Sequence, residues 1–407
     1  MVELHPHAMA HGGEAIARRD GKAHFIAGVM PDEVVVASIV EDRGSWARAE
    51  LVEIVEASPG RRSAPCPHAE ACGGCQWQFA DESHQRDWKR NTVASQLEHL
   101  GRIASPTVHP TATTGSVLGY RNRMDFHVVD GKPGLMRARS NDAVPLDVCL
   151  LLHPTLKPVF DALGDLTGVE RITLRSGTRT GDLLVVIEGD VPTHASQWGV
   201  PVVHRTSGKT TAVFGEATLR EVVDGVTFSI PVDGFFQNNT EGADVLVGLV
   251  RLAADLEGHE TLLDAYSGVG LFGATVGADA ALVLGIDSLP NAVEFARRNV
   301  AARGIDHRYI AGSVTRDIEA LEAYWDVAVL DPPRKGIGVR GVEAVTSAMP
   351  RRIVYVSCDP ASLARDAKLL SDVGYGFVDA TPVDMFPQTY HVEIVATFDR
   401  LVDDPEE

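Results

Sequence analysis

The strongest constraint on the fold is a regular alternation of apolar runs and helix-like stretches after residue 260. The runs "TLLDAYSG", "LVLGIDS", "WDVAVLDPP" and "RIVYVSC" are each followed by a stretch with helical spacing. Continuous apolar strands between helices are typical of a mostly parallel sheet that is covered on both faces. We therefore predict that residues 231–407 form a doubly wound, Rossmann-like α/β domain, entered through an amphipathic helix after "GFFQNN".

The chain before this region has different patterns. Residues 1–57 contain short β-like runs separated by turns, and "RRDGKA" carries the Asp-Gly signal of a hairpin. They predict a small β-barrel of the OB-like type. Residues 58–230 combine strands, such as "RITLRS" and "DLLVVIEG", with a helix over 84–101, which predicts a central α+β domain. A length of 407 residues suits two or three domains.

Composition and the N-terminal sequence favour a cytoplasmic protein. No apolar run reaches the roughly 18 residues of a membrane span, and the first residues have no apolar core like that of a signal peptide. In the cytoplasm the five cysteines are not expected to form disulfides, so metal-binding or catalytic roles gain weight.

The net charge of -19 is unusual for a nucleic-acid-binding protein, which normally presents a basic surface. Binding needs only a local patch, however. Residues 86–139 hold nine Lys and Arg against four Asp and Glu, a local balance of +5. Charge alone therefore neither supports nor excludes an RNA partner.

A glycine turn in "LLDAYSGVGLFG" indicates a nucleotide-like ligand. Gly268 and Gly270 follow a buried strand and precede a helix, and Asp287 ends the next strand, where a carboxylate can accept from ribose hydroxyls. Only two glycines fall at the turn, and Asp264 ends its strand. This pattern suits S-adenosylmethionine better than a dinucleotide, because S-adenosylmethionine has no phosphate to bind.

Two further strands end in reactive side chains. In "VAVLDPPRKG" the prolines hold Asp331 rigidly at the carboxyl edge of the sheet, although a stiff turn with a capping Asp is the alternative. In "RIVYVSCDP" Cys358 directly follows the next strand. A lone cysteine in such a place is most often a buried structural residue.

Taken in order, "DAYSGVGLFG", "DPPRKG", "VSCDPASLARD" and "MFPQTYHVEIVATFDR" resemble the RNA 5-methyluridine (uracil-C5) methyltransferase family over nearly the whole chain. The opening barrel resembles the TRAM domain that often precedes these enzymes. The resemblance implies methyl transfer from S-adenosylmethionine to C5 of a uridine in structured RNA, either rRNA or tRNA. In that reaction a thiolate adds to C6, C5 attacks the methyl group, and a base removes the C5 proton.

The resemblance also implies roles for particular residues. Cys358 would be the nucleophile and Glu393 the general base, with His391 as the local alternative base. The cofactor contacts would be Gln237, Tyr266, Asp287, Ser313 and Asp331. Arg334 and Lys335 would meet RNA phosphate or the developing enolate oxygen. This chain has Asp359 where the family has Asn, and its charge would raise the pKa of the adjacent thiol.

The other four cysteines form a separate set. Cys66, Cys72 and Cys75 lie close together in "CPHAEACGGC", and Cys149 stands alone. Spacing leaves zinc and an iron–sulfur cluster both open, because four thiolates serve either. The resemblance favours a [4Fe-4S] cluster, which leaves Cys358 for chemistry.

Two other functions remain open at this point. An RNA cytosine-C5 methyltransferase would use the same thiolate chemistry, and a non-catalytic RNA-binding protein could retain the fold. Trp77 is a candidate for stacking on RNA, with a core position as the alternative. We expect a monomer with no membrane association and no obligate protein partner.

Overall fold

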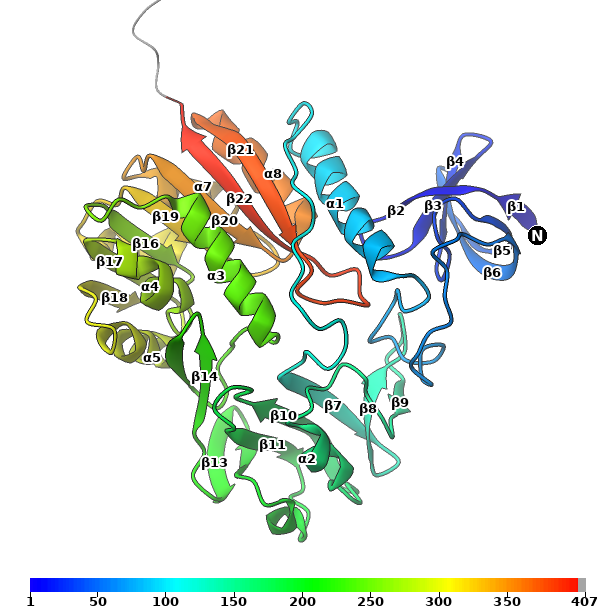
Figure 1. The fold of residues 1–407 in the computed structure, drawn as a ribbon, viewed down its shortest axis with the longest axis horizontal. Helices are drawn as coiled ribbons and strands as arrows, with labels where there is room; N and C mark the ends of the chain where they lie inside the picture. The colour runs from blue at the N-terminus through cyan, green and yellow to red at the C-terminus, as the bar shows by residue number, and fades with distance from the viewer. Residues whose placement is uncertain (402–407) are drawn as a thin grey trace, which may run out of the picture.

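The computed structural model describes residues 1–401, which form three large sheets and a two-stranded ribbon. The three sheets belong to an N-terminal, a central and a C-terminal unit, which surround a set of long connecting loops (Figure 1). The predicted fold class is confirmed: a Rossmann-like α/β unit is preceded by a small barrel-like sheet and a central α+β unit.

The N-terminal unit is a six-stranded sheet in the order β1-β5-β6-β4-β3-β2. Asp20 and Gly21 both have positive φ, which is the conformation of the predicted hairpin turn. Register shifts between the two longest strands curl the sheet, as a small barrel requires. The strands are β1 Val2–Leu4, β2 Pro6–Met9, β3 Ala15–Arg19, β4 Lys22–Ile26, β5 Val34–Asp42 and β6 Trp46–Glu56.

The central unit is a seven-stranded sheet in the order β13-β12-β11-β10-β7-β8-β9, with the short helix α2 (Lys157–Asp161) against it. Its core is apolar and includes Phe126, Ile172 and Trp198. The strands are β7 Arg123–Val129, β8 Lys132–Met136, β9 Ala143–Pro145, β10 Val169–Ser176, β11 Leu183–Gly189, β12 Val202–Thr206 and β13 Lys209–Phe214. The ribbon β14 Leu219–Val223 and β15 Val226–Ile230 leads to the C-terminal unit.

The C-terminal unit has the strand order β18-β17-β16-β19-β20-β22-β21, with only β22 antiparallel to its neighbours. The strands are β16 Thr261–Ala265, β17 Leu282–Asp287, β18 His307–Ala311, β19 Val327–Leu330, β20 Arg352–Ser357, β21 Tyr375–Val383 and β22 Glu393–Arg400. The helices are α3 Thr240–Ala254, α4 Leu271–Thr275, α5 Pro290–Ala301, α6 Val314–Asp317, α7 Gly338–Thr346 and α8 Pro360–Asp372. One apolar core lies on each face, as a doubly wound sheet predicts.

Helix α1 (Glu82–His99) packs on the C-terminal unit, although it precedes the central sheet in the chain. Val93 and Leu97 join Leu363 of α8 in one core, and the following loop bonds to β21 through the Ala112 amide and the Pro382 carbonyl. The sequence grouped this helix with residues 58–230. A local pattern predicts the helix but does not indicate which unit it packs against.

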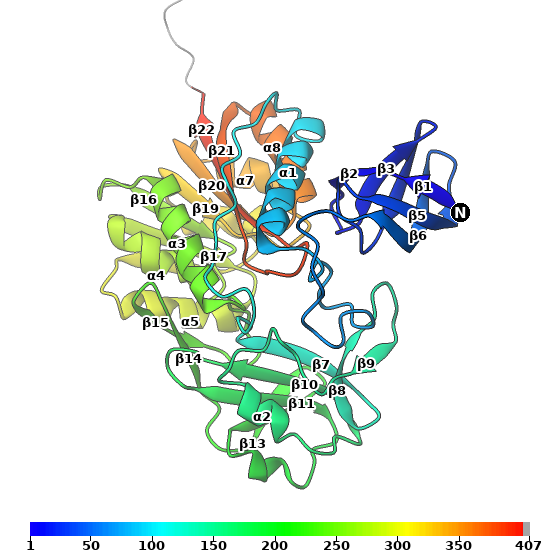
Figure 2. The same cartoon turned by 45° about the vertical axis from the view of Figure 1, so that its right-hand side comes forward.

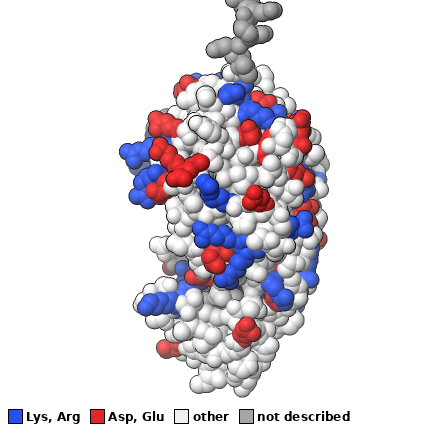
Figure 3. All heavy atoms as spheres, turned by 90° about the vertical axis from the view of Figure 1, so that its left-hand side faces the viewer, with Lys and Arg blue, Asp and Glu red and all other residues white. Residues whose placement is uncertain are grey.

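Figure 2 shows the N-terminal sheet beside α1 and α8, on the opposite side of the C-terminal unit from β17 and α5. The face that carries β18 and α5 shows Lys and Arg interspersed with Asp and Glu, without a large patch of one sign (Figure 3). Within residues 1–401, no helix is long and apolar enough to cross a membrane.

Candidate active site and cysteine pocket

The candidate active site lies at the carboxyl edge of the C-terminal sheet. The strand order reverses between β16 and β19, and ligands of open α/β sheets bind beside such a reversal. Tyr266 follows β16, Asp331 follows β19 and Cys358 follows β20. Glu393 begins β22, which runs antiparallel to β20, so it reaches the same edge from the opposite direction.

A cavity of about 650 Å³ opens at this edge, a size typical of small-molecule sites. The structure brings the seven residues predicted for cofactor binding and catalysis together around it: Gln237, Tyr266, Asp287, Ser313, Asp331, Cys358 and Glu393. Lys335 also lines the cavity. Their sequence positions span more than a third of the chain, and the fold brings them together: six end, follow or begin strands of the C-terminal sheet, and Gln237 precedes α3.

The glycine turn shapes one wall of the cavity. Gly270 has a φ of +80°, and a Cβ there would lie 3.2 Å from the Cβ of Ala296 in α5. The Gly268 amide donates to Asp287 Oδ2 at 3.0 Å, and the Leu289 amide donates to Oδ1 at 2.8 Å. Asp287 therefore holds both sides of the cleft in place. Tyr266 also has a positive φ of 61°, which is strained for a residue with a side chain and turns it at the strand end.

Buried carboxyl groups give the cavity its electrostatic character. Burial, with the charge of nearby Asp287, raises the pKa of Asp331 to about 7. Burial and the neighbouring Asp331 raise the pKa of Glu393 well above its ordinary value. Among the contacts that set these two pKa values within residues 1–401 there is no hydrogen bond from a protein donor. Buried acids without donors favour a cationic ligand, because a positive charge would offset the cost of ionising them.

The thiol of Cys358 is held in its protonated form in the ligand-free protein. Burial raises its pKa to about 12, and the carboxyl groups of Glu393, Asp331 and Asp359 act in the same direction, while Arg334 opposes them. Glu393 lies beside this thiol because Ile394, the next residue, pairs with Ser357 in the sheet. The pair thus places a carboxyl group next to a thiol, an arrangement that can serve nucleophilic catalysis.

His391, the alternative base, does not line the cavity. Burial, together with surrounding cations, of which Arg334 is the strongest, lowers the pKa of His391 to about 4. Trp77 is in the core rather than on an RNA-facing surface: it is 1% exposed, and its Nε1 donates to the Gly13 carbonyl. The structure thus decides between the two positions that the sequence left open for it.

The loop between β21 and β22, residues 384–392, leads into Glu393, and sequence reasoning, which used most of it as a motif, missed its contacts. Lys89 of α1 is fully buried and bonds to Asp384 at 2.5 Å and to the Phe386 carbonyl at 3.0 Å. The Gln388 amide donates to Gln85, and its carbonyl accepts from the amide of Trp77. These partners are about 300 residues apart in the chain, so no local pattern could reveal them.

The basic segment 86–139 does not form one free basic face. Lys89 is buried against Asp384, Arg123 pairs with Asp125, and Arg139 pairs with Glu14. Ion pairs within the structure therefore neutralise part of the local net charge of +5.

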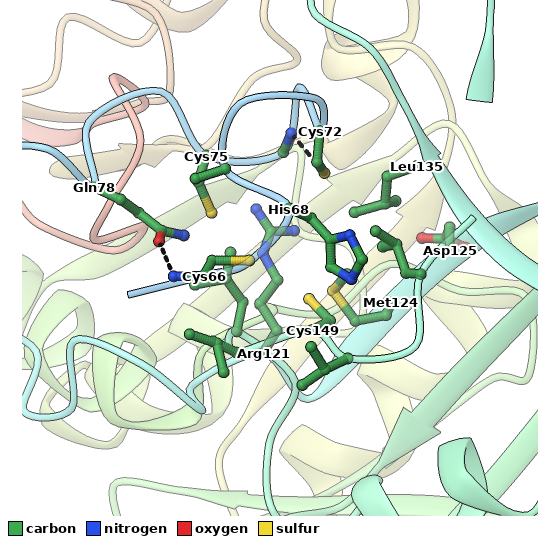
Figure 4. A pocket seen from close by; sticks show the side chains of 16 residues that line it. Cys66, His68, Cys72, Cys75, Gln78, Arg121, Met124, Asp125, Leu135 and Cys149 are labelled. Atoms are coloured by element: carbon green, nitrogen blue, oxygen red, sulfur yellow. Dashed lines mark hydrogen bonds between the residues drawn. The ribbon is translucent and has the colours of Figure 1, made fainter. Parts of the chain in front are cut away.

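The four clustered cysteines line a second pocket of about 180 Å³, between the β6–α1 loop and the central unit. Figure 4 shows the thiols of Cys66, Cys72, Cys75 and Cys149 around it, with the guanidinium of Arg121 among them. Burial raises the pKa of Cys72, of Cys149 and of Cys75, the last to about 12. The Nε of Arg121 is buried and has no hydrogen-bond partner among the described residues.

The prediction of a metal site is not supported by the arrangement of these side chains. In the part of the chain that the structure describes, no group of three or more His, Cys, Asp or Glu side chains is placed to hold a metal ion. The structure therefore gathers the four predicted cysteines in one pocket without giving them the geometry of ligands to a single ion.

Comparisons with known proteins relate the chain to RNA methyltransferases. Residues 192–400 match the model of the family described as tRNA (Uracil-5-)-methyltransferase. An uncharacterized RNA methyltransferase of Gloeobacter violaceus is 38% identical over 97% of this chain and 95% of its own, and one of Streptomyces avermitilis is 36% identical over 97% and 96%. The crystal structure of the Pyrococcus abyssi tRNA (uracil-54, C5)-methyltransferase with S-adenosyl-L-homocysteine is similar with a TM-score of 0.78 and 25% identity. It covers 98% of this chain and 100% of its own.

Proposed function

The chain belongs to the tRNA (uracil-5-)-methyltransferase family, and we propose that it transfers a methyl group from S-adenosylmethionine to C5 of one uridine in structured RNA, through a covalent bond between Cys358 and C6. The observation that carries this proposal is the pairing of Cys358 and Glu393 at one end of a cavity whose other residues suit the cofactor. Family membership makes the protein an S-adenosylmethionine-dependent RNA methyltransferase; the covalent mechanism and the residue roles are our proposal.

The residues at the cavity suit S-adenosylmethionine. The glycine turn allows close approach of the ligand, and Asp287 lies where ribose hydroxyls would meet a carboxylate. The uncompensated carboxyl group of Asp331 favours a ligand with ammonium and sulfonium charges. S-adenosylmethionine, when bound, supplies the electrophilic methyl group.

The chain's own residues would carry the remaining steps. Cys358 gives its proton to water and adds to C6, which moves electron density to C5. C5 then bonds to the methyl carbon while the bond from that carbon to the sulfonium sulfur breaks, and the sulfur keeps the electron pair. Glu393 then removes the C5 proton, the bond between C6 and Cys358 breaks, and the thiolate leaves with its electron pair. The raised pKa of Glu393 makes its carboxylate a stronger base, and a cationic ligand in the cavity would favour the ionised form that accepts the proton. The target uridine must leave its base stack to expose C6.

Methyl transfer from labelled S-adenosylmethionine tests this proposal. Unmodified tRNA transcripts and large-subunit rRNA transcripts are offered separately, and the digested nucleosides are identified by mass spectrometry. We expect 5-methyluridine in one RNA class, which also identifies the substrate. The Cys358→Ala variant should bind the cofactor and give no product. Formation of 5-methylcytidine would instead support the cytosine-C5 alternative, and turnover by Cys358→Ala would refute the nucleophile.

We also propose that Cys66, Cys72, Cys75 and Cys149 hold a [4Fe-4S] cluster. The four thiols line one pocket, and the carboxylate in its lining, Asp125, is paired with Arg123. Arg121 supplies a positive charge beside the thiols, and its Nε has no hydrogen-bond partner among the described residues. A single zinc ion needs four sulfurs about 2.3 Å from one point. The structure does not have such a group among its described residues, so the proposal rests on the shared pocket and on the family resemblance, not on ligand geometry. No catalytic step depends on it.

Analysis of anaerobically purified protein tests the cluster. We expect about four iron and four sulfide per chain and broad visible absorption, both lost in a Cys72→Ser, Cys75→Ser double variant. Cys358→Ser is the matched control and should keep its iron. Stoichiometric zinc without sulfide, or a metal-free protein, would refute the proposal.

A further inference from the structure

We propose that His11 of the N-terminal unit is a positioning residue for the active site, acting on Asp359 beside the nucleophile. The inference rests on the proposed role of Cys358. It gives the N-terminal unit a part in the chemical step, in addition to any contact that it makes with RNA.

The turn between β2 and β3, residues 10–14, is docked on the C-terminal unit. A Cβ at Gly13 would lie 2.9 Å from Cδ1 of Tyr390, so only glycine lets the turn approach the loop that leads to Glu393. The Gly13 carbonyl accepts a hydrogen bond from Trp77 Nε1 at 3.1 Å. Glu14 extends the contact to the central unit through Arg139. The turn is therefore fixed by all three units.

From this turn His11 reaches the loop that carries the nucleophile. Its Nε2 lies 3.3 Å from Oδ2 of Asp359, and the two side chains are 26% and 11% exposed. Arg334, in the loop after β19, brings its Nε to the same oxygen, also at 3.3 Å. The other oxygen, Oδ1, caps α8 by accepting from the Ser362 amide at 2.8 Å. Both oxygens of Asp359 therefore have partners.

These partners matter because residue 359 is an acid. An ionised carboxylate next to Cys358 opposes formation of the thiolate, whereas the Asn expected from the family resemblance would not. His11 and Arg334 share the charge on Oδ2 and keep the carboxylate in its capping position. With Asn at 359 the cap would persist and the contact with His11 would lose its electrostatic importance. The contact is thus needed because of the particular residue that this chain carries.

Trapping the covalent intermediate tests the inference. RNA with 5-fluorouridine at the methylated position should bond to Cys358 and stay attached, because Glu393 cannot remove fluorine as it removes a proton. The rate at which the covalent complex forms on denaturing gels is measured at saturating RNA and S-adenosylmethionine. We expect His11→Ala to slow it about fivefold, the size of a coupled pair in contact. His11→Gln, which keeps a donor at a similar position, should restore most of the rate.

The same His11 substitution in Asp359→Asn protein distinguishes a positioning role of His11 from a general effect on the structure. In Asp359→Asn protein, the further change His11→Ala should alter the rate by less than about twofold. His7→Ala, an exposed histidine of the same unit, is the matched control and should react like the wild type. RNA affinity and melting temperature, measured for each variant, should change little.

The outcomes distinguish this inference from the proposed function. If the wild type forms no covalent complex, the proposed mechanism fails and this inference with it. If the wild type reacts but His11→Ala slows formation of the covalent complex equally in the wild-type and Asp359→Asn proteins, or changes only RNA affinity, then the inference alone is overturned. The N-terminal unit would in that case act through RNA binding.

Discussion

The high pKa of Cys358 leads to a quantitative prediction about its reactivity. The pKa of about 12, against 9.0 for an ordinary thiol, lowers the thiolate fraction near pH 8 about 1000-fold, because each pKa unit is a factor of ten. A more basic thiolate is intrinsically more nucleophilic, with a Brønsted slope of about 0.45, which returns a factor of about 20. We therefore expect alkylation of Cys358 to be about 50-fold slower than that of a free cysteine.

The assay is alkylation by iodoacetamide, followed by digestion and mass spectrometry of the peptide that contains Cys358. A synthetic peptide of residues 354–364 is the matched reference, because it has the same neighbours without the buried cavity. The logarithm of the rate should rise with a slope of one from pH 7 to 10 in the protein. In the peptide it should level off near pH 9.

The pH profile distinguishes the electrostatic explanation from steric shielding. Shielding would slow alkylation by a constant factor, and the protein would then level off at the same pH as the peptide. Such a profile, or a rate equal to that of the peptide, would show that Cys358 is not held protonated, and the reasoning from burial would be wrong. Cys358 lines an open cavity, so the reagent has access to it.

Three other predictions follow from the same structure. Lys89→Met should lower the free energy of unfolding by about 3–5 kcal/mol in denaturant titrations, because it leaves Asp384 buried without a donor; Lys89→Met with Asp384→Leu should recover most of the loss. The ratio of the affinity for S-adenosylmethionine to the affinity for its product, whose sulfur carries no charge, should rise between pH 6 and 8 in calorimetry. The pKa of Asp331 is raised to about 7, so its carboxylate is ionised only above that pH and attracts the sulfonium there; a flat ratio would contradict this. Gln388 has a φ of +70°, so Gln388→Gly should be more stable than Gln388→Ala by about 1 kcal/mol in thermal melts, while both lower kcat.

The sequence predicted those parts of the site that depend on strand ends. Tyr266, Asp331 and Cys358 each follow an apolar run directly, and parallel strands bring their carboxyl ends to one edge. The strand order could not be read from these runs, but any doubly wound order places the three loops on that edge. The prediction therefore depended on local patterns and one general rule.

The remaining parts depend on contacts between distant segments. His11 and Asp359 are separated by 348 positions, and Lys89 and Asp384 by 295. Lys89 looked like part of a basic surface in the sequence, because a lysine is rarely fully buried unless it is paired. The cysteine spacing predicted one metal centre for the four thiols. The structure gathers these thiols in one pocket, but the spacing contained no information on whether they would stand at ligand distances.

The loop of residues 384–392 connects the candidate active site to segments that are distant in the chain. It accepts hydrogen bonds from the cysteine loop through the Gln388 carbonyl, from the central unit through Tyr120 and from α1 through Lys89. Its last residues lead directly into Glu393, the proposed base. Because these partners help to position the loop, a change in any of them should move Glu393 relative to Cys358. Variants at these contacts should therefore lower kcat while leaving cofactor affinity nearly unchanged, since Asp287 and the glycine turn are held by separate contacts.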